Sequence, residues 1–166
     1  LINVVYSLFA RSVPVLDIFT IAFGFVLRVV GGALAIGQPL SAWMFVTTLC
    51  LALYLAAMKR RHELKTLGSA SRSSLNSYSA SVVERFAEIS ATSALVCYCI
   101  FVITVKAELV YTIPLVAFGL FRYWFIAENL KTAESPTEAM LRDWPLLASV
   151  VLWVGVCAGV LLFAGN

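Results

Sequence analysis

The sequence predicts an all-α protein, a polytopic transmembrane helical bundle. Of its 166 residues, 61% are hydrophobic and 13% are charged, and the mean hydropathy is +0.94. Soluble globular domains carry about 25% charged residues, so this composition indicates a membrane protein. Five apolar runs also reach the length of about 20 residues that a helix needs to cross a hydrocarbon core about 30 Å thick.

The five predicted spans cover residues 13–36, 39–58, about 86–105, 109–126 and 144–163. The apolar stretch from Leu1 to Phe9 is too short to cross a membrane alone, which predicts the end of a span that begins upstream. Since the chain also starts without Met, we expect a fragment of a longer protein. No signal peptide is expected, because the first residues lack a basic region and a small-residue cleavage site.

Several common functional classes are excluded by what the sequence lacks. It contains no GxGxxG, no Walker A loop, no HExxH and no heptad repeat, which excludes soluble nucleotide-binding folds, and no nucleic acid partner is expected. The four cysteines all lie inside apolar runs, and two of them would point about 200° apart on one helix. We therefore expect neither a disulfide nor a metal site from Cys50, Cys97, Cys99 and Cys157.

The basic residues predict the orientation of the bundle. If five helices alternate, one side receives Arg11, then Lys59, Arg60, Arg61, Lys65 and Arg72, and finally Arg122, Lys131 and Arg142. Lys106 alone falls on the other side. By the positive-inside rule, the two long polar loops, residues 59–81 and 127–143, are cytoplasmic. Any chemistry is then expected at the cytoplasmic mouth, although basic loops of this kind are also ordinary topology signals that contact anionic lipid.

A charged residue inside the first predicted span needs an explanation. Arg28 stands near the middle of this run, where a cation costs at least a few kcal/mol and by default faces the bundle interior or a wet cavity. A structural partner such as Asp17 or Glu88 explains it most simply. Asp17, however, lies about 16 Å away along the same helix, so the two cannot pair directly. Each is expected to reach another helix or a ligand.

The segment KRRHEL follows the second span directly. If the helix continues past the membrane surface, Lys59, His62 and Glu63 share one face, and Arg60 also reaches inward. Such a group suits an anionic ligand, because Lys supplies a mobile charge and Arg a fixed fork for phosphate oxygens. An exposed ion pair between Lys59 and Glu63 is an equally common use of this spacing.

Two polar segments carry weaker signals. The hydroxyl-rich stretch SASRSSLNSYSAS before the third span predicts helix capping, with a phosphate-contacting role for Arg72 and Tyr78 as the alternative. In the last loop, SPTEAMLRD predicts a short amphipathic helix that begins at Ser135 and Pro136. Asp143 then precedes the final span, where a capping role is expected and Pro145 is tolerated in the first turn.

Together these segments resemble the C-terminal half of the UbiA superfamily of intramembrane prenyltransferases, and within it the decaprenyl-phosphate phosphoribosyltransferase branch. The stretches that carry the resemblance are YSLFARSVPVLDIFTIAFGFVLRVVGGALAIGQPLSAW, KRRHEL, RSSLNSY, FRYWFIAENL and LRD. The resemblance implies that residues 1–166 are the C-terminal part of a single domain of nine transmembrane helices around a central cavity. It also implies Mg²⁺ as cofactor, held mainly by an NDxxD motif upstream of this sequence, and a role in cell-envelope biosynthesis.

The chain departs from the superfamily pattern at two positions. Prenyl-diphosphate enzymes resembling it carry a second motif, DxxxD, where this chain has Lys59 and Glu63. A Lys does not bind Mg²⁺, so no metal ligand is expected among these residues. Lys59 and Arg60 are instead expected to supply the positive charge that a metal ion would present to a phosphorylated donor. Arg11 stands where Lys is common in the family, which keeps the charge.

The resemblance implies an inner-membrane, multi-pass enzyme that transfers 5-phosphoribose from phosphoribosyl pyrophosphate to a polyprenyl phosphate in the membrane, with its active site facing the cytoplasm. The expected catalytic residues are Lys59 and Arg60, on the donor phosphates, and Glu63, which orients them or the ribose. The expected substrate-binding residues are Arg28, Arg72, Tyr78, Arg122, Tyr123, Asp17 and Asp143. Two alternatives stay open: a UbiA-type prenyltransferase that uses a prenyl diphosphate and an aromatic or other acceptor, and a non-catalytic module that binds polyprenyl phosphate.

Overall fold

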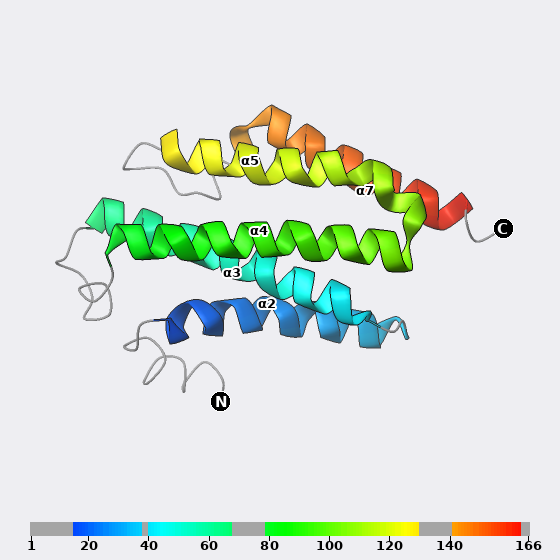
Figure 1. Cartoon of the computed structure of the whole chain (residues 1–166), viewed down its shortest axis with the longest axis horizontal. Coiled ribbons are helices and arrows are strands. Elements are labelled where there is room, and N and C mark those ends of the chain that lie inside the picture. The colour runs from blue at the N-terminus through cyan, green and yellow to red at the C-terminus, as the bar shows by residue number, and fades with distance from the viewer. Residues whose placement is uncertain (1–14, 38–39, 68–78, 130–140, 164–166) are drawn as a thin grey trace. The chain divides into compact units, whose positions relative to one another are not determined.

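A computed structural model describes residues 15–37, 40–67, 79–129 and 141–163, and all regular structure in these ranges is helical (Figure 1). The α-helices are α2 (Leu16–Ala35), α3 (Ala42–Leu67), α4 (Ala80–Val105), α5 (Ile113–Asn129) and α7 (Trp144–Phe163), and the 3₁₀ helix η4 (Ala107–Thr112) leads into α5. They form two compact units, Leu1–Ala94 and Leu95–Asn166, and α4 contributes to both.

The membrane character predicted from the sequence is confirmed. Within the described residues, four helical segments are long and apolar enough to cross a membrane: Leu16–Ala35, Ala42–Lys65, Ala80–Val105 and Ala107–Asn129. The fifth predicted span is present as α7, in which Trp144–Val160 is a shorter apolar helix. The chain is therefore an all-α, multi-pass membrane protein.

In the first unit, α2 and α3 pack as antiparallel neighbours. A connection of only six residues, 36–41, joins them, and Gly37 within it has φ +65°, the left-handed conformation that glycine adopts without strain. Ile18, Ala22 and Val26 recur every fourth residue on α2 and are all buried. On α3 the buried residues Ala52 and Ala56 have the same spacing. A small side chain such as that of Ala22 lets two membrane helices approach closely.

In the second unit, hydrogen bonds between side chains connect α4, η4 and α7. The Tyr98 and Thr112 hydroxyls lie 2.6 Å apart, and the indole N–H of Trp153 donates to the Tyr98 oxygen over 2.9 Å. Tyr98 and Thr112 are both buried. A buried hydroxyl without a partner is costly, so this cluster specifies how the three elements meet.

Two predicted loops are shorter than expected. The prediction of a loop over residues 59–81 is wrong at both ends, because 59–67 continue α3 and 80–81 begin α4. The prediction for 127–143 is wrong at its start, because α5 continues to Asn129. Hydropathy marks where a chain leaves the apolar layer, whereas Lys, Arg, Glu and Leu are good helix formers that extend a helix into water. The helix expected from Ser135 is described only at its last residues, Leu141 and Arg142, which are helical.

Candidate functional site

The C-terminal end of α3 carries the charged segment KRRHEL on a helix, as the sequence predicts. At about 1.5 Å per residue, the 26 residues of α3 extend for about 39 Å, which exceeds a hydrocarbon core of about 30 Å. We name Lys59, Arg60, Arg61, His62 and Glu63 the α3 cluster. It lies on the last two and a half turns of the helix, beyond its apolar part.

Arg60 is one of the two buried members of the α3 cluster. Its Nη2 forms an ion pair with Oδ2 of Asp17, in the first turn of α2, and the side chains are 4% and 0% exposed. Its Nη1 lies 2.5 Å from Oε2 of Glu63, one turn further along α3. Arg60 therefore links α3 both to α2, through Asp17, and to its own next turn, through Glu63.

Arg61 points to a different helix. Its Nη2 lies 3.0 Å from Oε1 of Glu84, near the start of α4, and the two side chains are 5% and 38% exposed. The sequence predicts no specific role for Arg61 beyond its contribution to the orientation of the bundle. No local spacing reveals this pair, because 23 residues separate its members.

Lys59 differs from the two arginines that follow it. Its side chain is exposed, and it makes no ion pair with any residue that the structure describes. His62 and Glu63 are half-buried. The pairing of Lys59 with Glu63, which was the alternative use of this spacing, is not formed, and Glu63 pairs with Arg60, three residues before it. Within this cluster, Lys59 is the cation that the described contacts leave available for an anionic ligand.

Arg28 does not form the carboxylate contacts expected from the sequence. Asp17 is occupied by Arg60, and Glu88 is exposed and forms no ion pair with Arg28. Arg28 is itself exposed within the first unit, and its guanidinium lies 5.3 Å from the centre of the Phe25 ring. The sequence correctly predicted that Asp17 must reach another helix, but for Arg28 no such partner occurs among the described residues.

Arg122 and Asp143, predicted as substrate-binding residues, bind each other in the second unit. Arg122 Nη2 donates to Asp143 Oδ2 over 2.7 Å, and Nε donates to Oδ1 over 3.0 Å. Asp143 Oδ1 also accepts the backbone N–H of Leu146 over 2.9 Å, so the predicted capping of α7 is confirmed. The hydrogen bonds from Arg122 lower the pKa of Asp143. Tyr123, the next residue of α5, is buried.

The remaining candidates lie outside the described residues. These are Arg11, Arg72 and Tyr78, and the structure assigns them no contacts. The capping predicted for the same hydroxyl-rich stretch is confirmed at Ser79, whose Oγ accepts the N–H of Val82 over 3.3 Å at the start of α4.

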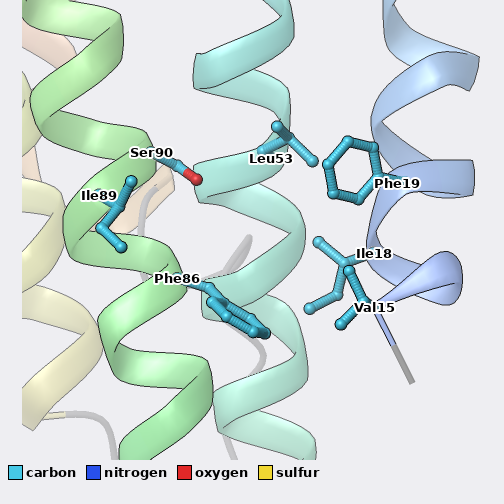
Figure 2. Close-up of a pocket in the computed structure, with 7 residues that line it drawn as sticks. All are labelled: Val15, Ile18, Phe19, Leu53, Phe86, Ile89 and Ser90. Carbon is cyan, nitrogen blue, oxygen red and sulfur yellow. The ribbon is translucent and has the colours of Figure 1, made fainter.

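An apolar cavity of about 220 Å³ lies in the first unit, between the helices that Arg60 and Arg61 connect. Figure 2 shows its lining from three sides: Val15, Ile18 and Phe19 at the start of α2, Leu53 from α3, and Phe86, Ile89 and Ser90 from α4. Ile18, which lines the cavity, directly follows Asp17 in α2. The lining residues are apolar except for Ser90, which carries a hydroxyl, so the cavity suits a hydrocarbon chain.

The described carboxylates do not by themselves fit a Mg²⁺ site. Mg²⁺ requires nearly octahedral oxygen ligands, and proteins supply them mainly through carboxylates and substrate phosphates. No group of three or more His, Cys, Asp or Glu side chains converges anywhere in the described ranges. Asp17 and Glu63 do converge, but on the guanidinium of Arg60. An internal cation thus occupies the place between these two carboxylates.

The chain is similar to curated proteins named decaprenyl-phosphate phosphoribosyltransferase. It is 27% identical to the one from Mycolicibacterium smegmatis, over 98% of this chain and 56% of the relative. It is 28% identical to the one from Corynebacterium glutamicum, over 87% of this chain and 46% of the relative. The protein of that name from Mycobacterium tuberculosis is 29% identical over 56% of this chain and 32% of its own length.

These relatives confirm the resemblance predicted from the sequence. The chain spans about half the length of the curated relatives that it matches. No family model matches the chain.

Proposed function

We propose that this chain is part of a membrane enzyme that transfers 5-phosphoribose from phosphoribosyl pyrophosphate to a polyprenyl phosphate. The observation that carries the proposal is the similarity to decaprenyl-phosphate phosphoribosyltransferases, which in one relative extends over 98% of this chain. The multi-pass helical fold supports an acceptor that resides in the membrane.

The proposed reaction is a displacement at the anomeric carbon of phosphoribose. An oxygen of the lipid phosphate forms the new C–O bond with inversion, and the bond to pyrophosphate breaks, so that pyrophosphate leaves with the electron pair. The acceptor phosphate is already ionised near neutral pH, so no strong general base is needed. The barrier falls mainly through electrostatic stabilisation of the negative charge that develops on pyrophosphate.

Lys59 is the residue of the α3 cluster that we assign to the donor phosphates. It stands beyond the apolar part of α3, is exposed, and forms no ion pair among the described residues, so its ammonium group is available for phosphate oxygens. Glu63 lies one turn further and orients the cations around it. Arg72 and Tyr78 are proposed to close over the donor.

For the lipid phosphate or the 5-phosphate we propose Arg28, Arg122 and Tyr123. A cation inside a span is expected to meet an anion, and Arg28 meets no carboxylate within the described residues. Arg122 already has a carboxylate partner in Asp143, which holds its guanidinium in one orientation. The cavity beside α2 offers an apolar surface for part of the polyprenyl chain.

Dependence on Mg²⁺ belongs to the same proposal, with ligands expected upstream of this sequence. Mg²⁺ would supply Lewis acidity toward the pyrophosphate oxygens. We further propose that the enzyme resides in the inner membrane with its active site facing the cytoplasm, since the basic residues concentrate on one side of the predicted topology.

The direct test uses the complete protein in nanodiscs with polyprenyl phosphate, Mg²⁺ and ribose-labelled phosphoribosyl pyrophosphate. Label should enter the organic phase, and chelation of Mg²⁺ should stop it. Lys59→Ala should lower kcat/KM by tenfold or more, a loss of about 1.4 kcal/mol of transition-state stabilisation. Its thermal midpoint should not change, because Lys59 is exposed. Transfer from a prenyl diphosphate with no phosphoribosyl transfer would favour the prenyltransferase, and no transfer from either donor would favour the binding module.

A further inference from the structure

The contacts of Arg60 favour a role different from the direct phosphate contact predicted for it. Its side chain is 4% exposed within the first unit alone. Additional chain packed around this unit would only increase that burial. Arg60 also has two carboxylate partners, Asp17 and Glu63, on its two terminal nitrogens. Its Nε is buried and makes no hydrogen bond to any described residue.

The carboxylates on Arg60 also disfavour a phosphate ligand. A phosphate would have to compete with Asp17 and Glu63 for the same guanidinium nitrogens. A phosphate that displaced Asp17 would separate this fully buried carboxylate from the guanidinium of Arg60. Such an arrangement is costly, so Arg60 is held by its partners rather than shared with a donor.

We infer that Asp17 and Arg60 are positioning residues, which orient the end of α3 so that Lys59 meets the donor phosphates. This inference rests on the proposed phosphoribosyl transfer. Asp17 occupies the first turn of α2, where the helix dipole favours a carboxylate, and it is anchored further by the N–H of Ile18, 2.8 Å from Oδ1. Through this pair, the start of α2 is joined to the end of α3.

The second ion pair fixes the rotation of α3. Successive residues of an α-helix point about 100° apart, so Arg60 and Arg61 leave α3 in two different directions. The first reaches Asp17 on α2 and the second reaches Glu84 on α4. Lys59, about 100° before Arg60 and 200° from Arg61, then points away from both contacts, in agreement with its exposure. Two partners on two helices prevent α3 from turning Lys59 into an interface.

The test is a double-mutant cycle in the complete protein, with Asp17→Asn, Arg60→Met and the combination of both. Each protein is measured for its thermal midpoint in detergent and for the kcat and KM of transfer with phosphoribosyl pyrophosphate. Each single variant removes one member of the ion pair and leaves the other charge buried, so both should have a lower midpoint than the wild type. The double variant removes both charges and should regain most of the lost midpoint.

Kinetics then separate a positioning role from direct contact. If Arg60 positions Lys59, the double variant regains at least tenfold in kcat/KM over Arg60→Met as its stability returns. If Arg60 contacts the donor, the double variant stays as inactive as Arg60→Met despite its recovered midpoint, and the inference is overturned. Lys106→Ala, which removes an exposed cation at the end of α4, serves as the control for a general loss of charge.

The stability cycle needs no substrate, so it keeps two failures apart. Midpoint losses that simply add in the double variant would refute the coupling of Asp17 and Arg60, even in an active enzyme. If the thermal midpoints of the variants show coupling but the wild-type protein transfers no phosphoribose, the proposed function is refuted instead, and the role of Lys59 with it.

Discussion

Asp17 and Arg60 form a buried ion pair that connects the first turn of α2 to the end of α3. Their side chains are 0% and 4% exposed, and 43 positions separate them in the sequence. The antiparallel packing of the two helices brings these ends together, since only six residues connect α2 to α3. The pair closes this helical hairpin at the end opposite its turn.

The two carboxylates on Arg60 should differ in their importance for stability. Asp17→Asn leaves Arg60 buried with a weakened partner and should cost about 3 kcal/mol of unfolding free energy. Glu63→Gln should cost less than about 1 kcal/mol, because Glu63 is 23% exposed and belongs to a local i, i+3 pair. Unfolding in mixed detergent micelles measures both. Equal losses of unfolding free energy in the two variants would show that the different burial of Asp17 and Glu63 does not decide their contribution.

Asp143 should stabilise the start of α7 through its cap. Asp143→Ala removes the acceptor of the Leu146 N–H and should cost about 1 kcal/mol, a typical value for a lost N-cap. Asp143→Asn retains an oxygen for this hydrogen bond and separates the cap from the charge. Thermal unfolding of the two variants should place Asp143→Asn between the wild type and Asp143→Ala. An Asn variant as unstable as Ala would indicate that the cap contributes nothing.

The same carboxylate should make stability depend on pH. The hydrogen bonds from Arg122 lower the pKa of Asp143 below its ordinary value of 3.8. The ionised form is therefore favoured in the folded state, and this stabilisation is fully present above pH of about 4. It is lost as the pH falls through the lowered pKa. Midpoints of wild type and Asp143→Asn should therefore differ at pH of about 6 and converge at pH of about 2. A difference in midpoint that stays the same at both pH values would contradict the lowered pKa of Asp143.

Tyr98 should be important for stability through its hydroxyl. Tyr98→Phe removes the contact with Thr112 and the acceptor of the Trp153 N–H, and should cost about 1 kcal/mol or more. Tyr111→Phe is the matched control, because Tyr111 is 81% exposed. Thermal unfolding of both variants should leave the control within experimental error of the wild type. A neutral Tyr98→Phe would show that another group satisfies Trp153 and Thr112.

Gly119 should tolerate a methyl group but not a larger side chain. A Cβ at this position of α5 would lie 3.7 Å from Ser149 Oγ on α7, an ordinary van der Waals distance. Gly119→Ala should thus be neutral or slightly stabilising, since Ala favours helix by up to about 1 kcal/mol over Gly. Gly119→Leu should separate α5 from α7 and lower the midpoint. Gly155→Leu controls for size alone, because nothing lies within 4 Å of a Cβ there.

Arg28 should affect the acceptor more than the fold. It is exposed within the first unit and contacts Phe25 but no described carboxylate. Arg28→Gln should therefore raise KM for polyprenyl phosphate by about tenfold, equivalent to about 1.4 kcal/mol, and Arg28→Lys should retain part of the affinity. A loss of folded protein in Arg28→Gln with unchanged KM would show that Arg28 pairs with a structural carboxylate outside the described residues.

Much of the fold follows from the sequence by itself. A hydrocarbon layer of fixed thickness requires apolar runs of about 20 residues, so composition and run length predict the helices without knowledge of their contacts. Local rules also predict the cap at Asp143, which needs only a short acidic side chain just before a helix. The helix ends were less predictable, because KRRHEL leaves the apolar layer and yet remains helical.

The tertiary structure decided which charges of the site are occupied. Lys59, Arg60 and Arg61 are consecutive and similar in the sequence, yet one is exposed and the other two are buried in ion pairs with Asp17 and Glu84. The helical repeat predicts that the three side chains point in different directions. It does not reveal which neighbouring helix carries a carboxylate at the same level along the helix axis. That information lies 43 and 23 positions away, on helices whose packing alone brings the partners into contact.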